Sequence, residues 1–164
     1  MSIRQATPED RDALQELVLR FREEVGRYRP SSSRSFSPAD AQAEVEDYFA
    51  AKYPIFVAED AVGEILGYLV CRVQDDVVWA EQLYVVPGAR RKGIGSSLYE
   101  QAERLAVELG SEAPYNWVDC TNYPIVRFLK KRGHTVLNLL ELRKPRPGER
   151  VERRIKVGKE EFYY

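Results

Sequence analysis

Apolar residues near the start of the chain recur at helical spacing. Between residues 11 and 26 they return every three or four positions and share one helix face; they are Leu14, Leu17, Val18, Phe21 and Val25. Hydroxyl–proline pairs at residues 7–8 and 37–38 have the usual chemistry of a helix start. The pattern predicts, in order, a strand, a helix, a surface loop and a second helix, at residues 3–6, 8–26, 27–37 and 38–51.

From residue 53 onward the pattern changes to strands. Short polar turns separate three apolar runs, which predicts an antiparallel meander over residues 55–58, 65–73 and 77–86. A helix, a strand, a helix and a strand should follow at residues 94–109, 115–120, 124–132 and 134–142, and residues 151–157 could return beside the last strand. This order predicts an α/β (α+β) fold with a mixed, mostly antiparallel sheet flanked by helices.

Length and charge narrow the picture. A chain of 164 residues is the size of one domain, so we expect residues 1–164 to form one. The net charge of −1 argues against generic electrostatic capture of nucleic acid. Residues 143–164 nevertheless carry eight Lys and Arg against four Glu, which leaves 17 basic and 22 acidic residues for 1–142. This basic extension could contact nucleic acid or an acidic partner. Its alternating Val151, Arg153, Ile155 and Val157 favour a last or dimer-forming strand, and hence a homodimer.

The few metal-ligand residues argue against metal chemistry. One histidine, His134, cannot supply the imidazoles that catalytic zinc usually takes, and Cys71 and Cys120 lie far apart in the sequence. The longest apolar stretch, residues 65–73, is too short to span a bilayer, and the N-terminus has no signal-peptide core. We therefore expect no metal, no membrane contact and a cytoplasmic location.

The segment from residue 81 to 98 carries the clearest chemistry. A hydrophobic strand ends at Pro87-Gly88, and a basic loop then leads into a strongly periodic helix. The start of a helix offers unpaired N–H groups and a positive dipole end, and Gly93 and Gly95 let an anion approach the backbone. Three cations and two hydroxyls add to this: Arg90, Arg91, Lys92, Ser96 and Ser97. The segment predicts a phosphate site, although a tight turn with solvated cations would also explain the two glycines.

Two familiar phosphate loops do not fit this segment. The chain has no G-x-x-x-x-G-K-S/T, which excludes a nucleoside-triphosphate P-loop. The dinucleotide fingerprint needs a third glycine that is missing here. The run from Arg90 to Gly95 instead matches Q/R-x-x-G-x-G/A, and the segment resembles the GNAT superfamily of N-acetyltransferases. Asn122, Phe128 and Gly133 resemble a downstream family segment, and the likeness extends over roughly residues 3–142 in element order.

The resemblance implies a binding mode for acetyl-CoA. In this family the cofactor lies where the fourth and fifth strands splay apart, the strand backbone pairs with pantetheine, and the helix start holds the pyrophosphate. Asn122 would lie near the cofactor on the other side of the splay. The residues so expected to bind acetyl-CoA are Leu83, Tyr84, Val85, Arg90, Arg91, Lys92, Gly93, Ile94, Gly95, Ser96 and Asn122.

The expected catalytic groups depart from the family pattern at one position. The family usually places an acidic tyrosine where this chain has Leu129, so Tyr123, Tyr99 or water would protonate the leaving thiolate. Tyr123 could equally be a packed loop aromatic. Glu81 is the expected base, because strand alternation would place it on the same face as Leu83 and Val85; the alternative is a salt-bridged or solvated residue.

Three further groups near the expected cleft are the backbone N–H of Val85 and the side chains of Asp119 and Cys120. By family analogy, the N–H of Val85 would stabilise the oxyanion. Asp119 lies on another strand that could line the cleft, and a structural role is favoured for it. A covalent route through Cys120 is disfavoured, because no histidine is positioned beside it by the sequence.

These features predict an N-acetyltransferase that moves the acetyl group of acetyl-CoA to the primary amine of a small molecule or a peptide, by direct attack in a ternary complex. The alternative, motivated by Leu129, is a non-catalytic acyl-CoA-binding module on the same fold. The first two helices and the 27–37 loop should form the acceptor side. Five acids there hint at a cationic acceptor such as a polyamine, a lysine side chain or a peptide N-terminus, or else form solvated helix faces: Glu23, Glu24, Asp40, Glu44 and Asp47.

Overall fold

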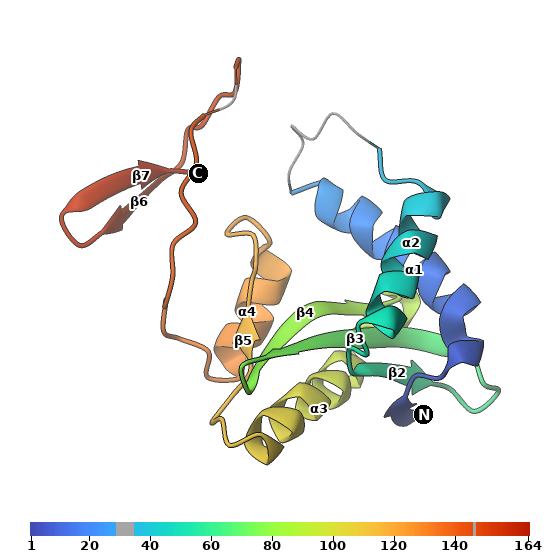
Figure 1. Cartoon of the computed structure of the whole chain (residues 1–164). Coiled ribbons are helices and arrows are strands. Elements are labelled where there is room, and N and C mark those ends of the chain that lie inside the picture. The colour runs from blue at the N-terminus through green and yellow to red at the C-terminus, as the bar shows by residue number, and fades with distance from the viewer. Residues whose placement is uncertain (29–34, 146) are drawn as a thin grey trace. The chain divides into compact units, whose positions relative to one another are not determined.

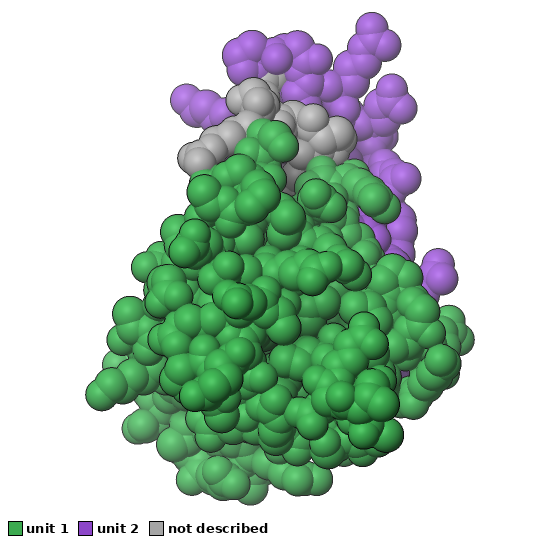
Figure 2. All heavy atoms as spheres, turned by 90° about the vertical axis from the view of Figure 1, so that its right-hand side faces the viewer, with its two compact units in different colours: residues 1–27, 34–117 green, residues 28–33, 118–164 purple. Residues whose placement is uncertain are grey.

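A computed structural model describes residues 1–28, 35–145 and 147–164 of the chain. These residues fall into two compact units (Figure 2). The first unit comprises residues 1–27 and 34–117, and the second comprises residues 28–33 and 118–164. Most of the predicted 27–37 loop lies outside the described residues. That residues 1–164 form one domain stays a prediction.

The first unit is built on a five-stranded sheet (Figure 1). The strands follow the order β1-β2-β3-β4-β5, with antiparallel pairing up to β4 and parallel pairing between β4 and β5. Their bounds are Ser2–Gln5, Ile55–Glu59, Ile65–Gln74, Val77–Val85 and Tyr115–Asn116. The mixed, mostly antiparallel sheet predicted from the sequence is confirmed.

Helices cover both faces of this sheet (Figure 1). On one face, α1 (Arg11–Gly26) and α2 (Pro38–Ala50) pack over an apolar core that includes Leu14, Val45 and Tyr68. On the other face, α3 (Ile94–Glu108) packs over a second core that includes Leu69 and Leu98. Two short 3-10 helices, η1 (Pro8–Asp10) and η2 (Pro87–Ala89), precede α1 and the loop before α3.

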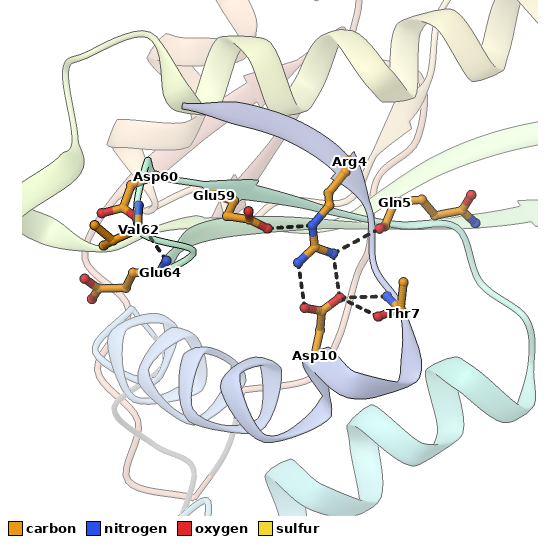
Figure 3. Close-up of polar contacts among 8 residues, drawn as sticks. All are labelled: Arg4, Gln5, Thr7, Asp10, Glu59, Asp60, Val62 and Glu64. Carbon is orange, nitrogen blue, oxygen red and sulfur yellow. Dashed lines mark hydrogen bonds and ion pairs between the residues drawn. The ribbon is translucent and has the colours of Figure 1, made fainter.

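The start of α1 is tied to the sheet by a buried carboxylate. Asp10 accepts hydrogen bonds from both terminal nitrogens of the Arg4 guanidinium, at 2.7 and 2.8 Å, and from the Thr7 backbone N–H at 2.7 Å (Figure 3). Arg4 also donates from Nε to Glu59 on β2 at 2.6 Å. The same close-up shows Asp60 accepting the N–H of Val62 in the turn after β2. The Thr-Pro-Glu-Asp start therefore joins the helix to the sheet.

The second unit contains α4 (Tyr123–Lys131) and a hairpin of β6 (Arg154–Val157) and β7 (Glu160–Tyr163). The predicted helix is confirmed, but two strand predictions need correction. Residues 134–142 form no strand, and β5 covers only two of the six residues predicted as a strand over 115–120. A strand requires a hydrogen-bonded neighbour, and in the described chain no segment pairs with 134–142. The segment around 154–157 pairs instead with β7 across a two-residue turn at Gly158.

Candidate active site

Strand β4 has a complete neighbour on one edge and a very short one on the other. It pairs with β3 from Val77 through Val85. Its pairing with β5 comprises only two residue pairs, Trp79 with Tyr115 and Ala80 with Asn116. Beyond Ala80, the ladder between β4 and β5 ends within the first unit. A ladder this short is in keeping with the separation of the fourth and fifth strands that the family resemblance implied.

Backbone alternation determines which groups face this open edge. The N–H of Val86 donates to the carbonyl of Leu66 at 2.9 Å, so this residue points toward the β3 side. Since neighbouring residues of a strand direct their N–H and C=O groups to opposite edges, Leu83 and Val85 present theirs to the open edge and Tyr84 presents its own to β3. Of the three residues predicted to bind pantetheine, Leu83 and Val85 therefore direct backbone groups to the open edge and Tyr84 does not; contact with pantetheine stays a prediction.

A β-bulge at Glu81 changes the side-chain pattern of β4. Gln82 pairs with Val70 and Ala80 pairs with Cys71, which leaves Glu81 without a cross-strand partner. A bulge inserts one residue and reverses the alternation beyond it. Glu81 consequently lies on the same face of the sheet as Arg72, whose Nε donates to the Glu81 carboxylate at 2.6 Å.

The sequence-based argument for Glu81 therefore needs correction. Leu83 and Val85 pack against α3 on the opposite face of the sheet, so the predicted shared face is wrong. The alternative of a salt-bridged strand residue describes the observed environment. A base role for Glu81 stays a prediction, and it would require Arg72 to release the carboxylate.

The predicted phosphate loop, residues 90–96, has a left-handed glycine directly before α3. Gly93 is the N-cap of α3 and has a φ of +86°, a backbone conformation that residues other than glycine rarely adopt. Ser97 makes the first helical bond, to the Gly93 carbonyl at 3.0 Å. The N–H groups of Ile94, Gly95 and Ser96 precede that bond and lie at the positive end of the helix dipole. The loop can present several donors to one anion.

The three predicted cations of this loop differ in their surroundings. Arg91 and Lys92 are exposed. Arg90 instead forms a bidentate ion pair with Glu24 of α1, at 3.0 and 2.6 Å, and donates from Nε to the Val85 carbonyl at 2.7 Å. The hydrogen bond to Glu24 raises the pKa of Arg90 above its already high ordinary value. Arg90 is thus committed to an ion pair, whereas Arg91 and Lys92 are the exposed cations of the loop.

The predicted acceptor side contains a buried polar network. Glu44 of α2 accepts hydrogen bonds from Arg22, Tyr48 and Gln82. Gln82, 5% exposed, in turn accepts the hydroxyl of buried Tyr68 at 2.8 Å. Burial raises the pKa of both tyrosines. Of the five acids proposed for a cationic acceptor, Glu44 is thus held in this network, as Glu24 is held by Arg90.

Gln82 and Tyr68 were not predicted as site residues. The available signal was a glutamine among the apolar residues of 77–86, where a buried polar side chain needs a partner. Its partners come from two segments far away in the sequence. The network includes Gln82, which directly follows the bulged residue Glu81, so it lies next to the β4 bulge.

The two tyrosines considered as acids have defined partners. Tyr99 is buried on α3 and its hydroxyl donates to Asn116 of β5 at 2.9 Å. In the second unit, Arg153 donates to the Tyr123 hydroxyl, and its guanidinium lies 5.5 Å from the ring centroid. An acid role for Tyr123 stays a prediction.

The remaining predicted residues of the second unit have local structural contacts. Asn122 is the N-cap of α4 and its side chain accepts the N–H of Ile125. Asp119 accepts the hydroxyl of Thr121 at 2.6 Å, in keeping with the structural reading. Leu129 is 5% exposed. A cofactor contact for Asn122 stays a prediction.

The described residues were also expected to lack a metal site and a membrane-spanning segment. No group of three or more His, Cys, Asp or Glu side chains there is arranged to hold a metal ion. None of the helices in that part of the chain is both long enough and apolar enough to cross a bilayer.

The sequence of the chain is similar to those of known acetyltransferases. A model of the acetyltransferase (GNAT) family matches residues 18–134, more than half of the chain. A curated relative is an uncharacterised N-acetyltransferase from Archaeoglobus fulgidus. It is 29% identical over an alignment of 164 positions, which covers 90% of this chain and 97% of the relative.

Solved structures share the fold at low sequence identity. A probable acetyltransferase superposes with a TM-score of 0.71 at 22% identity, covering 91% of this chain and 100% of its own. The aminoglycoside N-acetyltransferase AAC(6')-Iy in complex with CoA gives a TM-score of 0.65 at 17% identity, with coverage of 88% and 99%.

Proposed function

Because the chain belongs to the GNAT family of acetyltransferases, we propose that it transfers the acetyl group of acetyl-CoA to a primary amine by direct attack in a ternary complex. The observation that carries the proposal is the open edge of β4. The ladder to β5 ends at Ala80, whereas the ladder to β3 continues to Val85. An extended pantetheine arm can complete an open strand edge with backbone hydrogen bonds.

The residues next to this edge suit the charged end of CoA. The start of α3 follows β4 by way of a short loop, and its first N–H groups precede the first helical hydrogen bond. Exposed Arg91 and Lys92 add positive charge at the same place. A doubly charged pyrophosphate would be stabilised by such donors and cations together. A solved structure of the same fold was determined with CoA, which supports the proposal.

The chemistry needs four contributions from the protein. The amine must be neutral when it attacks, a group or water must take its proton, donors must face the developing oxyanion, and an acid must protonate the thiolate. The Val85 N–H points to the open edge and is the proposed oxyanion donor. Glu81 is the proposed proton acceptor, directly or through water. Tyr123 or water is the proposed acid, because the Tyr99 hydroxyl is committed to Asn116.

The acceptor is proposed to be a small-molecule amine. One structural neighbour is named as an aminoglycoside N-acetyltransferase, which makes polyamino sugars one class to test. The acidic side chains of α1 and α2 also suit a polycation, although Glu24 and Glu44 are held internally and Asp40 accepts the N–H and hydroxyl of Ser37, which leaves Glu23 and Asp47 to be tested. Polyamines, lysine derivatives and peptide N-termini complete the panel.

The proposal is tested by CoA release from acetyl-CoA across this panel, with CoA binding measured by calorimetry. Gly93→Glu places a carboxylate and a strained backbone at the proposed pyrophosphate site and should reduce CoA affinity at least tenfold. Gly110→Glu is the matched control, because Gly110 also has positive φ and open space around it and follows the opposite end of α3.

The outcomes separate the alternatives. Unchanged turnover in Gly93→Glu would refute the phosphate-loop assignment. CoA binding without transfer to any amine would instead favour the non-catalytic acyl-CoA-binding module.

A further inference from the structure

Arg90 and Glu24 form a bridge between α1 and the phosphate loop. We propose that Glu24 is a positioning residue that holds Arg90 against the Val85 carbonyl, so that Arg90 shapes the open edge of β4 rather than binding the pyrophosphate. This inference rests on the proposed function and adds to it a residue outside the family motif. It also changes the role predicted for Arg90 from its place in the sequence.

The geometry engages all three guanidinium nitrogens of Arg90. Its two terminal nitrogens donate to the two carboxylate oxygens of Glu24, and Nε donates to the Val85 carbonyl. The guanidinium also lies 5.4 Å from the centroid of the Tyr84 ring. The planar fork of arginine suits such a set of fixed directions, which a lysine ammonium cannot reproduce.

Charge balance argues against a direct contact between Arg90 and phosphate. The two side chains are only partly exposed, at 37% for Arg90 and 31% for Glu24. Moving Arg90 to an anion would leave the Glu24 carboxylate without its cation and close to the same anion. Exposed Arg91 and Lys92 carry no such cost. The phosphate charge is therefore assigned to these two residues.

The bridge affects the two parts of the cofactor site at once. By saturating the Val85 carbonyl, Arg90 removes one acceptor from the open edge and leaves the Val85 N–H and the Leu83 groups for the pantetheine arm. Arg90 also directly precedes Arg91, whose backbone has φ of +64°. Fixing the Arg90 side chain thus fixes the start of the loop that presents the helix N–H groups.

The test is calorimetric CoA binding to Glu24→Gln, Arg90→Lys, their double variant and Arg91→Ala, at several salt concentrations. If Glu24 positions Arg90, Glu24→Gln and Arg90→Lys should each weaken binding roughly tenfold. The double variant should be little weaker than either single one, because both changes break the same bridge. Their salt dependence should equal that of the wild type, whereas Arg91→Ala should reduce it.

Glu23→Gln is the matched control, since it removes an exposed carboxylate from the same turn of α1. Thermal unfolding of each variant separates a loss of folded protein from a loss of affinity. Once an acceptor is known, Glu24→Gln should raise KM for acetyl-CoA with a smaller change in kcat, and Glu24→Asp should restore part of the affinity.

Three results would overturn the inference. A direct phosphate role predicts tighter CoA binding in Glu24→Gln, because a competing anion is removed. It also predicts near-normal binding in Arg90→Lys, because the charge is kept. Unchanged CoA binding in Glu24→Gln would likewise contradict the positioning role proposed for Glu24. Failure of the wild-type protein to bind CoA would instead contradict the proposed function.

Discussion

Individual ionisable residues of the first unit are positioned mainly by partners on other elements. Asp10 is bound by Arg4, Glu24 by Arg90, and Glu44 by Arg22. None of these partners could be identified from the sequence, because each pair joins segments whose approach depends on the whole fold. The acids of α1 and α2 could be counted from the sequence, but their availability to a substrate could not.

The Arg4–Asp10 pair predicts an acid-dependent stability. The hydrogen bond from Arg4 holds the pKa of Asp10 below its ordinary value of 3.8. The folded state therefore gains stability above that pH and loses it as the pH falls through the depressed pKa. Asp10→Asn should lower the free energy of unfolding by about 1 kcal/mol at neutral pH, a modest figure because Arg4 is partly exposed to screening water.

Chemical denaturation at several pH values tests this prediction. The difference between the wild type and Asp10→Asn should shrink as the pH falls through the depressed pKa of Asp10, because the carboxyl then becomes protonated in the folded state as well as in the unfolded state. Asp12→Asn removes an exposed acid from the first turn of α1 and serves as the control. A difference that persists unchanged in acid would show that the ion pair is not its source.

At the scale of elements, the strand-to-helix connection from β4 to α3 was predictable and the details of β4 were not. The proline-glycine turn, the glycines and the helical periodicity are local signals. The bulge at Glu81 depends instead on the register with β3 and has no local signal. One inserted residue was enough to place Glu81 on the face opposite to the predicted one.

Strands β3 and β4 approach each other closely at Gly67, which leads to a prediction for a larger residue there. A Cβ atom on Gly67 would lie 2.6 Å from the Tyr84 carbonyl oxygen and 3.1 Å from the Val85 Cα, both backbone atoms of the proposed site. Gly67→Ala should destabilise the protein by about 1–3 kcal/mol, since a packed strand pair must move apart. Because the displaced strand is β4, CoA affinity should fall as well.

Thermal unfolding and calorimetry of Gly67→Ala check both expectations. Gly26→Ala is the control, because a Cβ there meets no atom within 4 Å and the residue ends α1 without positive φ. A fully stable Gly67→Ala protein with normal CoA affinity would show that the strands tolerate this separation.

At the scale of the molecule, the order of elements in the first unit followed from hydrophobic patterning. Residues 134–142 show where that reasoning fails. Their apolar content predicted a strand, but strand formation is decided by a hydrogen-bonded neighbour, and apolar content alone does not supply one. The C-terminal residues paired locally across Gly158 instead, because a two-residue turn brings adjacent segments together.

The unequal pairing of β4 also has a consequence for solvent exchange. In the ladder to β3, the amide protons of Tyr84 and Val86 are engaged, whereas those of Leu83 and Val85 point to the other edge. Deuterium should therefore enter this central strand at every second amide. Added CoA should slow the exchange of Leu83 and Val85 selectively, which exchange measured by NMR would detect. The exchange rates of individual amides in β4 would then show whether CoA occupies the proposed site.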